Sequence, residues 1–344
     1  MWHTAELSLQ IPANLYDSMI EGLRQIEGTP VNSKYKDNGV TLSFFKTNES
    51  YISYNVIAKI NFSKLLQAEE HVDLVTDADT EKILEHLNQI IDELFNHYDP
   101  EIYRLYGKIT LSDFTVRRID YTTQIDNLSQ EEINLYIRCV SKGDTSKLPK
   151  LKSGKQQYDE NRNYRKKYKN SFYHSNQSVT LNIYDKRQQL IEKQAPQAAI
   201  DKATGILRIE VQCKEGKVSA IARKYKTGKS LDGYLDAKIS RDMIRYYLSN
   251  VAGTQPYTTT NIIKTKINNR YKSKTKDRLL SLIDCISIQN KQLSEVQDEL
   301  YQQRADFKRD LKYIEALGHN PVPLPINSAI KNLPNLIDRL QFDE

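Results

Sequence analysis

Apolar and polar residues alternate strictly at the beginning of the chain. The apolar positions are Ala5, Leu7, Leu9 and Ile11. This pattern predicts a strand with one buried face. Apolar residues then recur at helical spacing over 15–23, which predicts a helix. Two β-rich stretches follow at 39–46 and 51–60, and an amphipathic helix is expected over about 79–97. The first unit is therefore predicted to be a strand, a helix, a hairpin and a helix.

A second unit begins near Phe114 and partly repeats this order. The pattern predicts a strand to Ile125, a helix with Ser129 as its N-cap, and strands at Val179–Asp185 and 206–213. We therefore expect an α+β fold. Its duplicated strand-helix-hairpin halves would form a largely antiparallel sheet with helices on one face.

The C-terminal part of the chain has a helical pattern. A Tyr/Thr/Lys-rich connector follows Gly253, and apolar residues recur at near-helical spacing from Leu293 to Ile314. The expected organisation is an N-terminal half over 1–113, a catalytic half over 114–250 with a basic loop at 141–170, and a connector with helices over 251–344.

Three strands of the second half carry polar residues on one face, because side chains alternate across a sheet. These residues are Arg118, Asp120, Thr122, Gln124 and Asp126 in the first strand, Thr180, Asn182, Tyr184 and Lys186 in the second, and Arg208, Glu210 and Gln212 in the third. If the strands are neighbours, these groups converge. A mixed strand face is often merely solvated, so the pattern alone leaves both interpretations open.

Such a surface suits phosphodiester chemistry. Asp120 and Glu210 offer oxygen ligands to Mg²⁺ or Mn²⁺, and such an ion neutralises charge on a scissile phosphate. Arg118 and Arg208 are candidate clamps for phosphate oxygens, although Arg-x-Asp and Arg-x-Glu pairs also form ordinary ion pairs.

A tyrosine on this face is a candidate nucleophile. The phenol of Tyr184 has an ordinary pKa near 10, so it needs help to attack at neutral pH. Lys186, expected two residues along on the same face, would stabilise phenolate character together with the metal.

Three short blocks carry a family resemblance. They are Arg118-Ile119-Asp120, Tyr184-Asp185-Lys186 and Arg208-Ile209-Glu210. In order and spacing they resemble the Arg-Ile-Asp, Tyr-x-Lys and Arg-x-Glu strands of the gene II replication initiators of filamentous phages. More distantly, the chain is similar to the Rep_trans initiators of Gram-positive plasmids and to relaxases.

The resemblance implies rolling-circle initiation. Such proteins nick one strand at an origin, keep a 5′-phosphotyrosine, release a free 3′-OH and later rejoin the strand. It implies that Tyr184 is the nucleophile and that Asp120 and Glu210 bind the metal. Tyr173 resembles an upstream tyrosine of some plasmid initiators, so it is the competing candidate for the nucleophile. Its alternative role is to stack on a DNA base.

Basic residues beside aromatic residues indicate contact with origin DNA, either single-stranded or supercoiled duplex. The candidates in the basic loop and in a second cluster are Lys155, Arg162, Arg165, Lys166, Lys167, Lys169, Arg223 and Lys224. Lysine-rich loops also serve solubility alone. The segment from Lys264 to Arg278 is a further basic stretch, and the C-terminal helices are expected to read duplex DNA, to form a homodimer or to brace the core.

The absence of several sequence motifs excludes some classes of function. The chain has no Walker phosphate loop, so unwinding and synthesis would fall to a host helicase and polymerase. It has no His-hydrophobic-His pair. Its three cysteines are far apart, which indicates neither a disulfide framework nor a zinc site. No signal peptide or membrane-length apolar run occurs. We therefore expect a bacterial cytoplasmic protein without a membrane partner. A conjugative relaxase and a non-catalytic DNA-binding protein are the alternatives.

Overall fold

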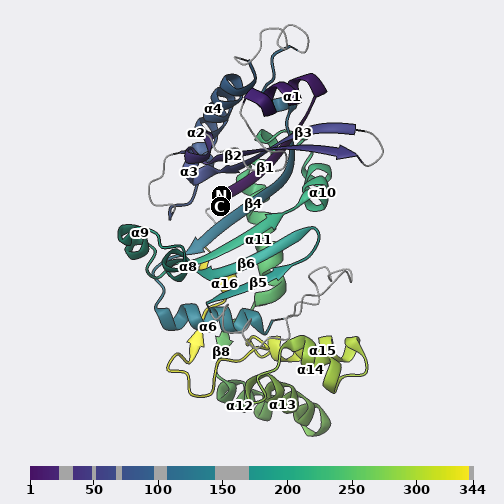
Figure 1. Ribbon diagram of the computed structural model, residues 1–344. Coiled ribbons are helices and arrows are strands. Elements are labelled where there is room, and N and C mark those ends of the chain that lie inside the picture. Colours follow the sequence, from purple (N-terminus) through teal and green to yellow (C-terminus); the bar gives the residue numbers. More distant parts are fainter. Residues whose placement is uncertain (23–33, 49–51, 67–71, 97–106, 144–169, 341–344) are drawn as a thin grey trace.

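A seven-stranded antiparallel sheet organises the protein (Figure 1). The computed structural model describes residues 1–22, 34–48, 52–66, 72–96, 107–143 and 170–340. In spatial order the strands are β2 (Val40–Asn48), β3 (Ile52–Asn61), β1 (Trp2–Ile11), β4 (Thr115–Ile125), β7 (Leu207–Cys213), β6 (Val179–Asp185) and β5 (Ser171–Ser175).

The two halves of the chain join where β1 pairs with β4. In the first half the β2–β3 hairpin lies directly beside β1. In the second half β7 lies between the β5–β6 hairpin and β4, and β7 has no counterpart in the first half. The expected repeat is therefore present in element order, while the spatial order of the strands differs by one inserted strand.

Helices cover one face of the sheet. The alternating residues Ala5, Leu7 and Leu9 are buried on this face, as their pattern predicted. The helices are α1 (Ala13–Gly22), α2 (Lys34–Asp37), α3 (Phe62–Leu65) and α4 (Thr80–Ile91) in the first half, and α6 (Gln130–Ser141), α10 (Glu215–Tyr225) and α11 (Ala237–Ala252) in the second.

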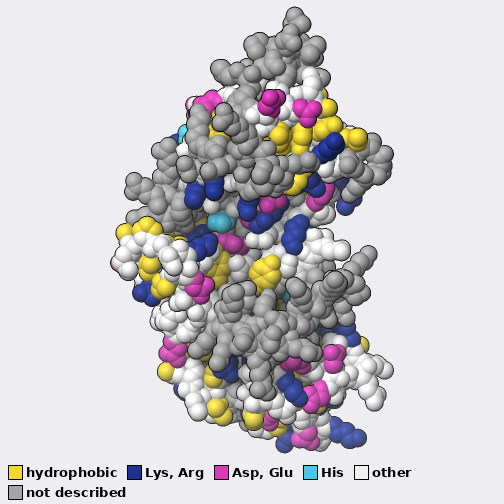
Figure 2. Space-filling model, in the orientation of Figure 1, with side chains coloured by type: hydrophobic (Ala, Val, Ile, Leu, Met, Phe, Trp, Pro, Cys, Tyr) yellow, Lys and Arg dark blue, Asp and Glu magenta, His cyan; other side chains and the backbone are white. Residues whose placement is uncertain are grey.

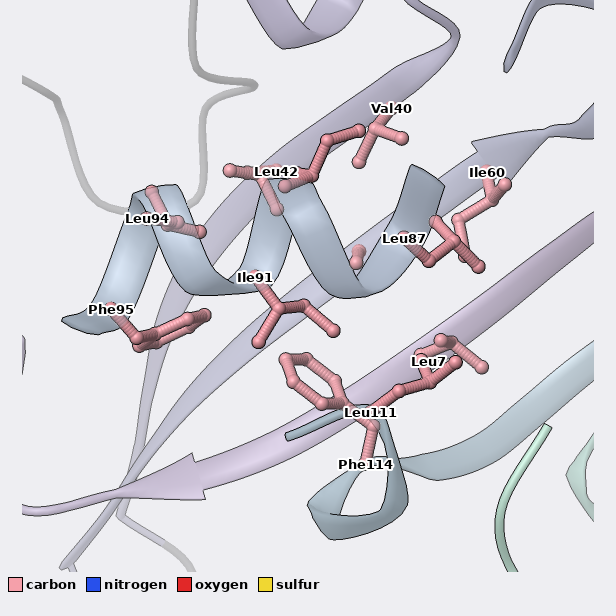
Figure 3. Close-up of a pocket in the computed structure, with 12 residues that line it drawn as sticks. Leu7, Val40, Leu42, Ile60, Leu87, Ile91, Leu94, Phe95, Leu111 and Phe114 are labelled. Carbon is pink, nitrogen blue, oxygen red and sulfur yellow. The ribbon is translucent and has the colours of Figure 1, made fainter. Parts of the chain in front are cut away.

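The packing of α4 on the sheet leaves a small apolar cavity (Figure 3). Leu87 and Ile91 point from α4 toward Leu7 and Leu42, and Phe114 lies below them. The lining is wholly apolar, so a water molecule would find no hydrogen-bond partner in this cavity.

Two short helices close one end of the second half. They are α8 (Lys186–Glu192) and α9 (Gln197–Lys202). Leu190 and Ile200 form a small separate apolar cluster with Val72. The predicted N-cap of α6 is also present, because the Ser129 hydroxyl accepts from the backbone N–H of Glu132 and the Glu132 carboxylate accepts from that of Ser129.

The C-terminal region is helical, as expected. It contains α12 (Thr260–Arg270), α13 (Ser273–Ser287), α14 (Leu293–Leu300), α15 (Arg304–Glu315) and α16 (Leu336–Arg339), with the short strands β8 (Tyr257–Thr258) and β9 (Asn332–Leu333). It packs beneath α6, where Tyr136 donates to the carbonyl of Pro334.

The predicted α+β class, with an antiparallel sheet, helices on one face and a helical C-terminal region, is confirmed. Among the described residues, no helix is both long and apolar enough to cross a membrane.

Candidate functional site

The polar face of the sheet gathers the candidate residues of the second half. The β4–β7 and β6–β7 registers place Thr122, Glu210 and Asn182 in one row across the sheet, and Tyr173 of β5 continues that row. The neighbouring row holds Gln124, Arg208 and Tyr184. Figure 2 shows basic, acidic and histidine side chains gathered over the middle of this face.

Tyr184 and Glu210 form a short hydrogen bond near the centre of this face. The Tyr184 hydroxyl donates to Glu210 Oε1 at 2.6 Å, and the tyrosine is 4% exposed. Burial and, after it, the negative charge of Glu210 raise the pKa of Tyr184 well above its usual value. The phenol is therefore protonated at neutral pH, and Glu210 is the group placed to receive its proton.

Asp120 is held by a guanidinium fork. Arg118 donates from Nε to Oδ1 at 2.8 Å and from Nη2 to Oδ2 at 2.7 Å, and its Nη1 reaches Glu6 Oε1 at 3.2 Å. Burial raises the pKa of Asp120 to about 6, against the lowering effect of Arg118 and with a further raising effect from the Glu210 charge. Arg118 is thus engaged by two carboxylates within the protein.

Arg208 does not occupy the position expected of a phosphate clamp. It is 1% exposed, and its Nη2 donates to Gln124 Oε1 at 2.7 Å and to the carbonyl of Val72. Among the described residues its Nε has no hydrogen-bond partner. The guanidinium is enclosed between the sheet and the segment at Val72, which the strand pattern alone could not reveal.

Lys186 lies on a helix and not on the strand as expected. Strand β6 ends at Asp185, whose carboxylate caps α8 by accepting from the backbone N–H of Gln188. Lys186 is the first residue of α8, and its ammonium donates to Gln189 Oε1 at 2.9 Å. Burial, and then the charge of Arg208, lower the pKa of Lys186 to about 7, so its ammonium releases a proton readily near neutral pH.

His3 belongs to the site, although no sequence pattern pointed to it. The register between β1 and β4 is irregular at this residue, and its Nδ1 lies 4.0 Å from Glu210 Oε1 and 3.0 Å from Thr4 Oγ1. Burial lowers the pKa of His3 to about 4, so the imidazole is neutral at physiological pH. The available signal was a histidine directly before the residues predicted to form the first strand.

Tyr173 differs from Tyr184 in access. It lies on the edge strand β5, and its side chain is 53% exposed. Because Tyr173 pairs with Asn182, it lies on the same face as Glu210. The structure therefore separates the two candidate nucleophiles into one that is buried beside a proton acceptor and one that is open to solvent.

The donor types around Glu210 fit a divalent cation. Asp120 and Glu210 offer carboxylate oxygens, which are common ligands for Mg²⁺ and Mn²⁺, and His3 offers a neutral imidazole, which suits transition metals better than Mg²⁺. The Glu210 charge adds to the effect of burial in raising the pKa of Asp120, so the two carboxylates lie close enough to act on each other. Within the described residues, no three His, Cys, Asp or Glu side chains are already arranged to hold a metal ion.

The predicted DNA contacts do not all lie on this face. Lys155, Arg162, Arg165, Lys166, Lys167 and Lys169 lie outside the described residues. Arg223 and Lys224 are exposed at the end of α10. This helix lies beside α11 on the apolar face, where Tyr225 donates to Asp242. These two cations are therefore remote from Tyr184.

Comparisons of the chain with protein-family models, with curated proteins and with solved structures find no match.

Proposed function

We propose that this protein nicks and rejoins one DNA strand through a tyrosine nucleophile, as a rolling-circle replication initiator. The observation that carries the proposal is the Tyr184–Glu210 hydrogen bond of 2.6 Å on a sheet face that also holds Asp120, with Lys186 at the start of α8 directly after the same strand. Buried acids beside a tyrosine and a lysine of lowered pKa are the groups that proton transfer at a phosphodiester requires.

The proposed step is an attack on a DNA phosphate by the Tyr184 hydroxyl. The phenol oxygen of Tyr184 attacks phosphorus while its proton passes to Glu210, with which it is already hydrogen-bonded. The bond between phosphorus and the 3′-oxygen breaks, and the departing oxygen takes a proton from the Lys186 ammonium. The products are a 5′-phosphotyrosine on the protein and a free 3′-OH, and reversal of the step rejoins a strand.

Tyr173 is the alternative nucleophile within the same function. Its exposure favours access to DNA, whereas the contact of Tyr184 with Glu210 favours deprotonation. If Tyr173 attacks, Tyr184 becomes a positioning residue for Glu210.

Asp120 and Glu210 would hold a Mg²⁺ or Mn²⁺ ion, with His3 as a further donor. Such an ion, when bound, supplies charge neutralisation at the scissile phosphate. Arg118 would then remain on Asp120 and orient it.

The proposed partners are origin DNA, either single-stranded or supercoiled, and a host helicase and polymerase in the bacterial cytoplasm. A conjugative relaxase would use the same chemistry at a transfer origin.

A non-catalytic DNA-binding protein is the second candidate. The enclosed positions of Tyr184 and Arg208, 4% and 1% exposed, favour it because a phosphate reaches neither group without rearrangement.

The test is a covalent adduct assay. Purified protein is incubated with labelled single-stranded fragments of its own replicon, with Mn²⁺ or EDTA, and resolved on a denaturing gel. We expect a metal-dependent adduct that Tyr184→Phe abolishes and Tyr173→Phe retains. Loss in Tyr173→Phe alone would move the nucleophile, and no adduct with any fragment would leave the non-catalytic function.

A second variant tests the role of Glu210. Glu210→Gln keeps an oxygen acceptor for the Tyr184 hydroxyl but removes the proton acceptor and one charged metal ligand, so adduct formation should slow at least tenfold even at saturating Mn²⁺ while the fold persists. An unchanged rate would exclude Glu210 as the base.

A further inference from the structure

We infer that α12 and the first turn of α13 form a contact surface for double-stranded DNA, separate from the polar face of the sheet. This inference deepens the proposed function and rests on it for the identity of the polyanion as DNA. The observations concern charge, exposure and the rigid attachment of these two helices.

The surface has one sign of charge. No acidic residue occurs between Asp242 and Asp277, while residues 260–276 contain six lysines and arginines. Four of these cations are exposed, namely Lys266, Arg270, Lys272 and Lys274.

Ion pairing within the protein does not account for these charges. Lys264 pairs with Asp284 and Arg278 pairs with Asp310, both on the inner side of α13. In the described part of the chain, none of the four exposed cations forms an ion pair. Lys272 and Lys274 also stand at the beginning of α13, where the helix dipole disfavours cations, so helix stability is not the reason for them.

Neutral side chains on the same helix suit base edges. The exposed residues of α12 include Asn261, Thr265, Asn268 and Asn269 beside Lys266 and Arg270. Amide, hydroxyl and guanidinium groups on one helix are those that hydrogen-bond to bases in a major groove, which is wide enough for an α-helix.

The aromatic side chain of this segment is not available for base stacking. The Tyr271 ring packs on Tyr313, and its hydroxyl donates to the carbonyl of that residue. Single-stranded DNA is bound largely by stacking on open aromatic rings, so this surface fits duplex DNA better.

The two helices are fixed relative to the sheet. Ile263 and Ile267 of α12 and Leu282 and Ile286 of α13 are buried in the core. Lys142, at the end of α6, donates to the carbonyl of Ile286 and accepts from the backbone N–H of Leu293. Figure 1 shows α6 between the sheet and α12–α13. Duplex DNA on this surface would therefore be held at a set distance from Tyr184.

The experiment compares two triple variants of the full-length protein. Lys266→Gln, Lys272→Gln and Lys274→Gln together remove charge from the surface. Lys229→Gln, Lys308→Gln and Lys312→Gln together remove the same charge from other exposed positions. Binding to a labelled duplex and to its single strand is measured by fluorescence anisotropy over a range of salt concentrations, and thermal unfolding checks both folds.

We expect the first triple variant to bind duplex about tenfold more weakly, with a flatter salt dependence, since each lost phosphate contact reduces the slope by about 0.9. Single-strand binding and the covalent adduct should be retained. Equal losses in both triple variants, equal losses for duplex and single strand, or no loss would each overturn the inference. If duplex binding is lost as expected but wild-type protein forms no adduct, the surface stands and the nicking function fails.

Discussion

In β2, β3 and β1 the face away from the helices carries mostly neutral, partly exposed side chains, whereas in β4 and β7 the same face carries buried charges. Gln10 and Lys59 of the first half are exposed, while Asp120 and Glu210 are 1% and 4% exposed. Both halves use the same alternation and share one apolar core. Amphipathic strands therefore account for the fold of both halves, and the buried charges need a separate reason.

Stability is a poor reason for those charges. Burying an ion removes its hydration, and an ion pair compensates for that loss of free energy only when its geometry is good. Asp120 has a fork from Arg118, but Arg208 has an Nε without a partner among the described residues. Polar groups kept in such positions are candidates for chemistry.

The largest expected loss of stability is the same in both halves of the protein. Ile91→Ala in α4 and Ile209→Ala in β7 should each lower the free energy of unfolding by about 4 kcal/mol, because each leaves a cavity in the shared core. Urea denaturation measures both. Two separate unfolding transitions in either variant would show that the halves unfold separately, contrary to the single core.

Substitutions on the other face should separate the halves. Asp120→Ala leaves Arg118 without its fork partner and should lower the free energy of unfolding by about 3 kcal/mol. Gln10→Ala, on an exposed position of β1, should change it by less than about 0.5 kcal/mol. Equal losses of unfolding free energy in the two variants, measured in the same denaturation assay, would show that the polar faces of the two halves do not differ in this way.

The pH dependence of stability is a further test of the difference between the two halves. Since the pKa of Asp120 is raised from 3.8 to about 6, the folded protein binds this proton more tightly than the unfolded chain. The resulting stabilisation, about 3 kcal/mol, is complete below about pH 4 and is lost as the pH rises through about 6. In Asp120→Asn, denaturation at pH 4, 5, 6 and 7 should lack this component, and an unchanged pH profile would contradict it.

The smallest expected effect concerns the two tyrosines. Tyr184→Phe removes a buried hydrogen bond to Glu210 and should lower the unfolding free energy by about 1.5 kcal/mol. Tyr173→Phe, at an exposed position, should change it by less than about 0.5 kcal/mol. Thermal unfolding of both variants would also show whether a loss of adduct reflects chemistry or misfolding.

Much of the sheet could be predicted because period-two alternation is a local property. The faces of β4, β6 and β7 follow from it, and so does the row containing Glu210 once the strands are neighbours. The position of β7 between β4 and the β5–β6 hairpin could not be predicted, since pairing depends on partners distant in sequence.

The site departs from its sequence pattern where local geometry breaks the alternation. An irregular register turns His3 toward Glu210, and the cap at Asp185 moves Lys186 from a strand to a helix. The enclosure of Arg208 depends on Val72, a residue of the first half. Each of these contacts is set by tertiary packing, which no short window of the sequence contains.

The join between β1 and β4 has a consequence for how the protein is made. Thr4 pairs with Asp120, and Thr122 pairs with Glu210, so the centre of the sheet consists of partners that are far apart in the sequence. Pairings between such distant segments form slowly, and a ribosome releases the chain from its N-terminus. His3 must therefore wait for Glu210 to be synthesised, so a growing chain that has not yet reached Glu210 cannot contain the assembled site.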